Sequence, residues 1–130
     1  MSEVTIHVGD CIEQMRNMPD ESVDTVITSP PYWGLRDYGN EAQLGLEKTV
    51  GEYVTNMVKV FDEVKRILKP QGTLWLNLGD SYNGSGGSGG DYNKGGIKEG
   101  QPKYGKKNTP SLKPKDLVGV PWRVAFALQE

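Results

Sequence analysis

Five consecutive residues, Ser29 to Trp33 (Ser-Pro-Pro-Tyr-Trp), combine a hydroxyl, two prolines and two aromatic rings. Proline fixes its own φ and restricts the residue before it, so the peptide groups of Ser29 and Pro30 are held in nearly one orientation. A fixed carbonyl beside a hydroxyl supplies acceptors for an amino group, and the ring of Tyr32 can stack on a planar ligand. The pattern predicts a site for a flat, amino-bearing ring. Taken alone, Pro-Pro-Tyr-Trp also fits a stiff surface turn or a polyproline ligand.

The other residue types narrow the chemistry. One cysteine, Cys11, and one histidine, His7, exclude an internal disulfide and a cysteine metal cage, so we expect neither thiol nor metal chemistry. With 130 residues there is room for one domain, and no apolar run approaches the roughly 20 residues that cross a bilayer. We expect a cytoplasmic protein without membrane contact. The net charge of −2 means that any DNA contact needs a local basic patch.

Strand and helix patterns alternate along the chain. We predict strands at 4–8, 23–28 and 73–79, and helices that start at Asp10 and Thr49, each followed by Glu at the capping-box spacing. A further helix is expected around Trp122, and both Trp75 and Trp122 are expected to pack in the core. Alternating strands and helices imply a parallel sheet, in which ligands bind at the carboxyl ends of the strands.

The stretch from Val23 to Gly39, VDTVITSPPYWGLRDYG, closely resembles the catalytic signature of the amino-group (N4-cytosine and N6-adenine) DNA methyltransferases with an N-terminal catalytic motif. The resemblance extends to Gly-Asp-Cys at 9–11 and to residues 50–82 and 113–129 in the family's order. It implies an α/β, partial Rossmann-like fold with a mostly parallel sheet and flanking helices. The implied reaction transfers a methyl group from S-adenosyl-L-methionine to the exocyclic amine of a base in double-stranded DNA.

The resemblance also implies roles for the motif residues. The Ser29 hydroxyl and the Pro30 carbonyl would accept hydrogen bonds from the amine of the target base, with Pro31 completing the catalytic motif. Tyr32 would stack on that base, which must be flipped out of the duplex. Trp33 would support this wall of the base site.

A second set of residues is implied for the cofactor. Asp10 would accept from the amino group of the cofactor's adenine, with Cys11 and Ser29 alongside, and Asp10 can cap a helix at the same time. In this family, enzymes with serine at the first motif position mostly methylate N4 of cytosine, and enzymes with aspartate there mostly methylate N6 of adenine. Ser29 therefore favours cytosine, and N6 of adenine is the alternative.

The region at about 83–113 is rich in glycine and lysine, and its composition predicts a flexible loop. Lys94, Lys106 and Lys107 can contact DNA phosphates, although lysines in such loops are also commonly just solvated. The glycines at 84–89 match the spacing of a dinucleotide-binding loop, which would suggest an oxidoreductase. The residues that follow lack helical periodicity, so we reject a nicotinamide cofactor.

Family members of this order continue with a target-recognition region and a Phe-x-Gly-x-Gly cofactor loop. Residues 1–130 contain neither, and they are expected to be the N-terminal part of a catalytic domain. We expect little activity without a C-terminal half or a second chain that completes the enzyme. The alternative is an inactive remnant that binds DNA. The setting implied is a bacterial, archaeal or phage-encoded enzyme, as in a restriction-modification system.

Overall fold

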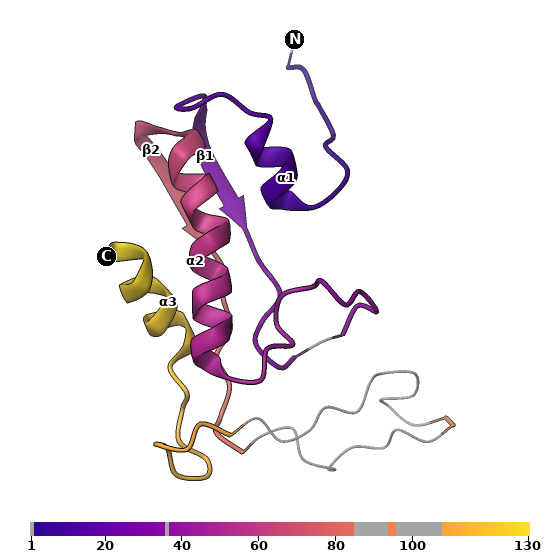
Figure 1. Cartoon of the computed structure of the whole chain (residues 1–130), viewed down its shortest axis with the longest axis vertical. Coiled ribbons are helices and arrows are strands. Elements are labelled where there is room, and N and C mark those ends of the chain that lie inside the picture. Colours follow the sequence, from indigo (N-terminus) through magenta and orange to yellow (C-terminus); the bar gives the residue numbers. More distant parts are fainter. Residues whose placement is uncertain (1, 36, 85–93, 96–107) are drawn as a thin grey trace.

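The computed structural model describes residues 2–35, 37–84, 94–95 and 108–130. The elements in chain order are α1 (Cys11–Arg16), β1 (Val23–Thr28), α2 (Val50–Ile67), β2 (Leu68–Leu76) and α3 (Val120–Gln129) (Figure 1). β1 and β2 pair in parallel, and α2 forms the connection between them. The α/β class, the parallel sheet and the flanking helices are as predicted, and they agree with a partial Rossmann-like fold.

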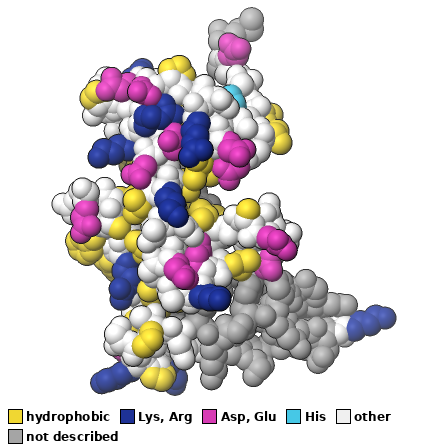
Figure 2. Space-filling model, viewed as in Figure 1, with side chains coloured by type: hydrophobic (Ala, Val, Ile, Leu, Met, Phe, Trp, Pro, Cys, Tyr) yellow, Lys and Arg dark blue, Asp and Glu magenta, His cyan; other side chains and the backbone are white. Residues whose placement is uncertain are grey.

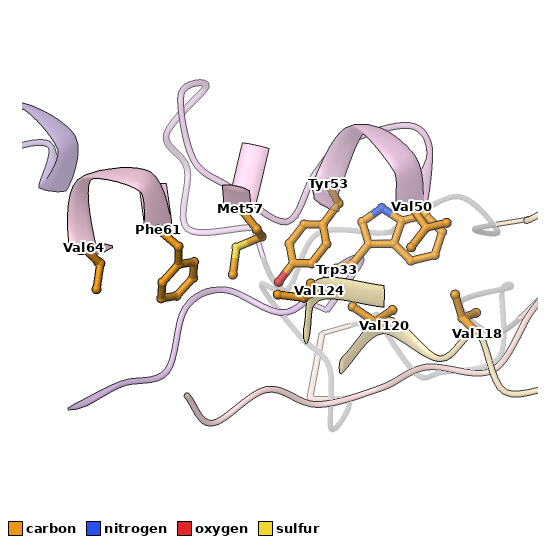
Figure 3. Packing of buried hydrophobic residues seen from close by; sticks show 9 residues of the cluster. All are labelled: Trp33, Val50, Tyr53, Met57, Phe61, Val64, Val118, Val120 and Val124. Carbon is orange, nitrogen blue, oxygen red and sulfur yellow. The ribbon is translucent and has the colours of Figure 1, made fainter. Parts of the chain in front are cut away.

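Helix α2 provides most of the core. Its capping box is complete, because the Thr49 hydroxyl accepts from the Glu52 amide (3.1 Å) and the Glu52 carboxylate accepts from the Thr49 amide (3.1 Å). Apolar residues three and four apart then form one buried face. That face packs against α3 and the loop after β1 (Figure 3). The central side chains of this core are Trp33, Val50, Tyr53, Met57, Phe61, Val64, Val118, Val120 and Val124.

Helix α1 begins at the predicted cap. The Asp10 carboxylate accepts from the amides of Ile12 (3.0 Å) and Glu13 (3.1 Å). At the other end of α1, the Arg66 guanidinium of α2 donates to the carbonyl of Met15 (2.7 Å). A charged donor on unpaired carbonyls at a helix C-terminus is favourable, so this contact fixes α1 against α2.

The predicted strand at 4–8 is wrong: these residues form no strand in the structure. Val4, Ile6 and Val8 are 82%, 81% and 86% exposed. A strand exists only where its backbone groups find a ladder partner, and the described part of the chain supplies none for this segment. A β-branched composition favours a strand, but composition does not create a partner.

The third predicted strand also needs correction, because β2 starts at Leu68, five positions before the predicted start at 73, and directly follows α2. The amide of Ser22 donates to the carbonyl of Ile67 (2.9 Å), which begins the pairing immediately after the helix. The register is irregular between Val23 and Thr25, and this accommodates Pro70 within β2.

The described helices cover only one face of the sheet. Val26 and Leu74 pair in register and pack toward the core, whereas the next pair, Ile27 and Trp75, points away and is 80% and 66% exposed. The prediction that Trp75 lies in the core is therefore wrong, because no described element covers this face. Trp122 is exposed as well, since α3 buries other side chains.

The start of α3 is held by Asp80, which lies beyond β2. Its carboxylate accepts from the amides of Gly119 (3.0 Å) and Val120 (2.9 Å). Gly119 has φ +77°, a left-handed conformation that glycine adopts without strain. A carboxylate at a helix N-terminus satisfies otherwise unpaired amides, so Asp80 joins the end of β2 to α3.

Both ends of the predicted flexible loop are fixed by Asn83. This buried side chain accepts from the Thr109 amide (2.7 Å) and donates to the Leu112 carbonyl (2.8 Å). Lys94 is described and exposed, whereas Lys106 and Lys107 lie outside the described residues. Over the coloured part of the face in Figure 2, basic and acidic side chains are interspersed.

Replacing Asp80 with alanine removes the acceptor for the first amides of α3. We expect Asp80→Ala to lower the free energy of unfolding by about 1 kcal/mol, measured by urea denaturation. Amide exchange in α3 should accelerate more than in α2. Asp80→Asn retains an acceptor and should lose less stability, and equal losses in the two variants would contradict the capping role.

Candidate active site

The loop after β1 forms a small cavity at the carboxyl end of the sheet. The Asn77 amide donates to the Thr28 carbonyl (2.9 Å), so the two chains continue side by side beyond the strands. A cavity of about 250 Å³ opens there. It is lined by Ser29, Pro30, Pro31, Tyr32, Leu35 and Tyr38. The structure thus brings the four predicted catalytic residues together, and we refer to this space as the motif cavity.

Tyr53 of α2 holds this loop from the core. Its hydroxyl donates to the Pro31 carbonyl (2.8 Å), and its side chain is fully buried. Burial first, and then the Glu47 and Tyr32 charges, raise the pKa of Tyr53 far above its ordinary value. The phenol therefore stays protonated and keeps donating. Among the described residues no donor reaches the Pro30 carbonyl, so this acceptor is available to a ligand.

Trp33 anchors the same loop but does not line the motif cavity. It is 3% exposed, and its indole N–H donates to the Glu47 carbonyl (3.0 Å). Figure 3 shows its ring beside Tyr53 and Val50. The structure therefore places Trp33 in the core beneath the loop, where it can support the position of Tyr32.

Tyr32 lies against the chain that follows β2. A Cβ at Gly79 would lie 2.6 Å from the Tyr32 ring, which is closer than real contacts allow. Only glycine permits this approach of the ring to the backbone. The β1–β2 pairing and Gly79 together therefore set the position of the Tyr32 ring.

A second cavity of about 560 Å³ adjoins the first. Asp10, Cys11 and Lys59 line it, and so does Pro31, which therefore forms a wall of both cavities. We refer to this space as the Asp10 cavity. One carboxylate oxygen of Asp10 caps α1, and the other has no hydrogen-bond partner within the described ranges. Lys59 adds a positive charge, and its ammonium donates to the Asn56 side chain (3.2 Å).

The Cys11 thiol is not activated in this position. Partial burial, and then the negative charge of Asp10, raise the pKa of the Cys11 thiol above its ordinary value. The thiolate is the nucleophilic form of cysteine, so this residue remains a neutral side chain near pH 7. Its place in the Asp10 cavity fits contact with a ligand rather than nucleophilic attack.

Other features of the described chain lie away from this region. A larger cavity, of about 680 Å³, lies between the C-terminal end of α2, β2 and α3, and its lining contains none of the predicted site residues. In the described ranges, no cluster of three or more His, Cys, Asp or Glu side chains could hold a metal ion. None of the helices described there has both the length and the apolarity needed to cross a bilayer.

Sequence reasoning did not identify four residues that shape the site: Tyr53, Gly79, Leu35 and Tyr38. The apolar residues after Thr49, Tyr53 among them, recur at helical spacing, which predicts burial of Tyr53 but says nothing about what its hydroxyl contacts. Gly79 was recognised only as the end of a strand. Tyr38 lies within the quoted signature, and the aromatic residue so close to the prolines was the available signal.

Comparison with known proteins identifies the family. The model of the N6- and N4-methyltransferase family, described as DNA methylase, matches residues 23–129. Type II methyltransferase M.SmaI of Serratia marcescens is 50% identical over 125 residues, which are 95% of this chain and 42% of the relative. M.XycI of Xanthomonas campestris pv. cyanopsidis is 48% identical, covering 97% of this chain and 42% of the relative. M.Cfr9I of Citrobacter freundii is 46% identical, and the match covers 100% of this chain and 43% of the relative.

No solved structure matches this chain. Fold and site together define an α/β protein with one cavity at the carboxyl end of β1 and a second cavity that shares Pro31 with it. The family match then makes the assignment specific: the chain belongs to the DNA methylase family. It spans less than half the length of these three relatives.

Replacing Tyr53 with phenylalanine tests the anchor of the motif loop. Tyr53→Phe leaves the partly buried Pro31 carbonyl without its donor, and we expect a loss of about 0.5–1.5 kcal/mol in the free energy of unfolding. Urea denaturation measures this loss. Tyr38→Phe removes an exposed hydroxyl and should change stability by less than about 0.5 kcal/mol. Equal stability of Tyr53→Phe and the original chain would contradict the anchoring role.

The single cysteine allows a clean test of the charge in the Asp10 cavity. Because the pKa of Cys11 is raised, its alkylation by iodoacetamide should reach half of its maximal rate at a higher pH than that of free cysteine. Asp10→Asn removes the negative charge and keeps a helix cap, so the midpoint should move to lower pH. The exposed Asp62→Asn serves as the control. A Cys11 midpoint at or below that of free cysteine would contradict the assignment.

Proposed function

We propose that this chain supplies the catalytic-motif part of a DNA methyltransferase, which methylates the exocyclic amine of a flipped base, N4 of cytosine. The observation that carries the proposal is the shared wall at Pro31. A cavity with fixed amine acceptors adjoins a cavity with the chemistry of a cofactor site, which methyl transfer between two bound molecules requires. The family match supports the same reaction class.

In the motif cavity, Ser29 and Pro30 provide the acceptors for the amine. Two acceptors on the amine hydrogens orient the nitrogen lone pair away from the loop, toward the incoming methyl group. Tyr32 provides an aromatic surface for the base, and Trp33 supports that surface from the core. Pro31 contributes its ring as the wall and its carbonyl as the point of attachment to Tyr53. Catalysis in this arrangement is by positioning.

The Asp10 cavity fits S-adenosyl-L-methionine. Its volume lies within the usual range for small-molecule sites, about 300–1,000 Å³. The free oxygen of Asp10 would accept from the adenine amine, with Cys11 alongside, and Lys59 would offset the carboxylate of the methionine part. Ser29, the third proposed cofactor contact, lines the adjoining motif cavity and would reach the cofactor from there. Ile12 adds apolar surface. When bound, the cofactor supplies an electrophilic methyl group.

The choice of base rests on Ser29. Family members with serine at the start of the motif mostly methylate N4 of cytosine. Methylation of N6 of adenine is the alternative. A chain that binds DNA without methylating it is the second candidate function. Lys94, Lys106 and Lys107 are proposed to contact the phosphates of double-stranded DNA, which gives salt-dependent binding.

We further propose that the active enzyme needs more of the methyltransferase fold than this chain contains, namely the part that its relatives carry outside the region aligned with this chain. The relatives are more than twice as long as the matched region. One sheet face carries the exposed Ile27 and Trp75, and parallel sheets are normally covered on both faces. The unpaired Val4, Ile6 and Val8 supply a further apolar segment for such a partner. The partner is the C-terminal half of the enzyme or a second chain.

Methyl transfer is tested by combining this chain with the portion of the Serratia marcescens relative outside the matched region. Plasmid DNA and labelled S-adenosyl-L-methionine are added, and digested nucleosides are analysed by mass spectrometry. We expect N4-methylcytosine, and N6-methyladenine would show the alternative base. Ser29→Ala should reduce transfer about 100-fold, as expected when one oriented hydrogen-bond group is lost.

Ser111→Ala, an exposed serine away from both cavities, is the matched control and should leave transfer unchanged. Calorimetric titration with S-adenosyl-L-methionine checks the cofactor cavity separately. DNA binding without methyl transfer, and without response to the cofactor, would refute the enzyme and support the DNA-binding remnant.

A further inference from the structure

The motif cavity has two lining residues to which no role has been assigned, Leu35 and Tyr38. They are 54% and 63% exposed. An aromatic ring this exposed, beside two carbonyls and a hydroxyl within one small cavity, has little to pack against within the described chain. Its remaining apolar surface is available to whatever enters the cavity.

Hydrogen bonds hold the backbone on both sides of Tyr38. The Gly34 amide donates to the Gly45 carbonyl (2.7 Å), which closes the loop at its base. Near the tip, the Tyr38 amide donates to the Gln43 side chain (2.5 Å) and the Gly39 amide donates to the Asp37 carboxylate (2.7 Å). The position of Tyr38 is therefore set by polar contacts, without burial of its ring.

Glu47 connects this loop to the core as well. Its carboxylate accepts from the Gly45 amide (2.9 Å) and from the Asn56 side chain on α2 (3.1 Å). Its carbonyl accepts from Trp33. The loop that carries Tyr38 and the segment that carries Tyr32 thus share one anchor, so the backbones of both segments are held beside the motif cavity that their side chains line.

We propose that Tyr38 is a second aromatic contact for the target base, with Leu35 as the apolar wall between it and the motif. This inference rests on the proposed function, since it needs a base in the motif cavity. A flat, amino-bearing base that is held by Ser29 and Pro30 presents its ring to the aromatic side chains of the same cavity. Stacking on such rings tolerates any base, so Tyr38 contributes to holding the base and leaves its identity to the amine acceptors.

Photo-cross-linking tests the contact without requiring methyl transfer. The probe is a single-stranded oligonucleotide of mixed sequence with 5-iodocytosine in place of cytosine, because base-modifying enzymes accept bases outside a duplex. The oligonucleotide is mixed with this chain and irradiated, and the cross-linked peptides are identified by mass spectrometry. We expect cross-links at both Tyr32 and Tyr38. Cross-links at Tyr32 without Tyr38 would overturn this inference and leave the proposed function standing.

Absence of cross-links from both rings would overturn the inference and the proposed base site together. Substitution then gives an independent readout, the dissociation constant of the same oligonucleotide by fluorescence anisotropy. Tyr38→Ala should weaken binding about fivefold or more, and Tyr38→Phe should retain it because the ring remains.

Tyr82→Ala is the matched control: Tyr82 is 59% exposed but lies outside the motif cavity, and binding should be unchanged. Circular dichroism confirms that each variant is folded. Equal losses for Tyr38→Ala and Tyr82→Ala would overturn the inference, since they would show a general surface effect.

Discussion

The hydrogen bond from the Tyr53 hydroxyl to the Pro31 carbonyl is the contact on which the site depends. It joins a fully buried side chain of α2 to the loop after β1, which Trp33 also anchors in the core. Burial keeps the phenol protonated, so the donor persists across the working pH range. Because Pro31 follows Pro30, fixing one carbonyl also limits the orientation of the peptide group before it. The core therefore determines where the free acceptors of the motif point.

The second constraint is that the described helices cover one face of the sheet. Val26 and Leu74 reach the core, whereas Ile27 and Trp75 face outward at the neighbouring register position. A parallel sheet of two strands with one bare face lacks part of its usual burial. The site residues nevertheless keep their geometry, because Tyr53, Gly79 and Glu47 act from the covered side or from the strand ends.

Most sequence predictions that depend on residues close together in the chain were confirmed, and those that depend on distant partners were not. The N-cap of α1 and the capping box and buried face of α2 were predictable, because they depend on residues two to four positions apart. The reciprocal Glu13 bond expected at α1 is not formed. The strand at 4–8 and the burial of Trp75 were wrong, because both depend on partners far along the chain. The motif was predicted as a unit, and its four residues do share a cavity. The contacts of Tyr53 and Gly79 could not be predicted, since a long-range contact of a hydroxyl or of a missing Cβ leaves no periodic signal.

The shared wall at Pro31 has a mechanical consequence for a transfer reaction. Two cavities separated by a flexible side chain would change their separation with each rotamer, whereas a proline ring has almost no rotamer freedom. A displacement of Pro31 moves the boundary of both cavities at once, and the Tyr53 hydrogen bond opposes that displacement. Reacting groups must be held to within a fraction of an ångström for positioning to lower a barrier. A proline between the two cavities, fixed by a buried phenol, would meet this requirement of the proposed transfer with two residues, Pro31 and Tyr53.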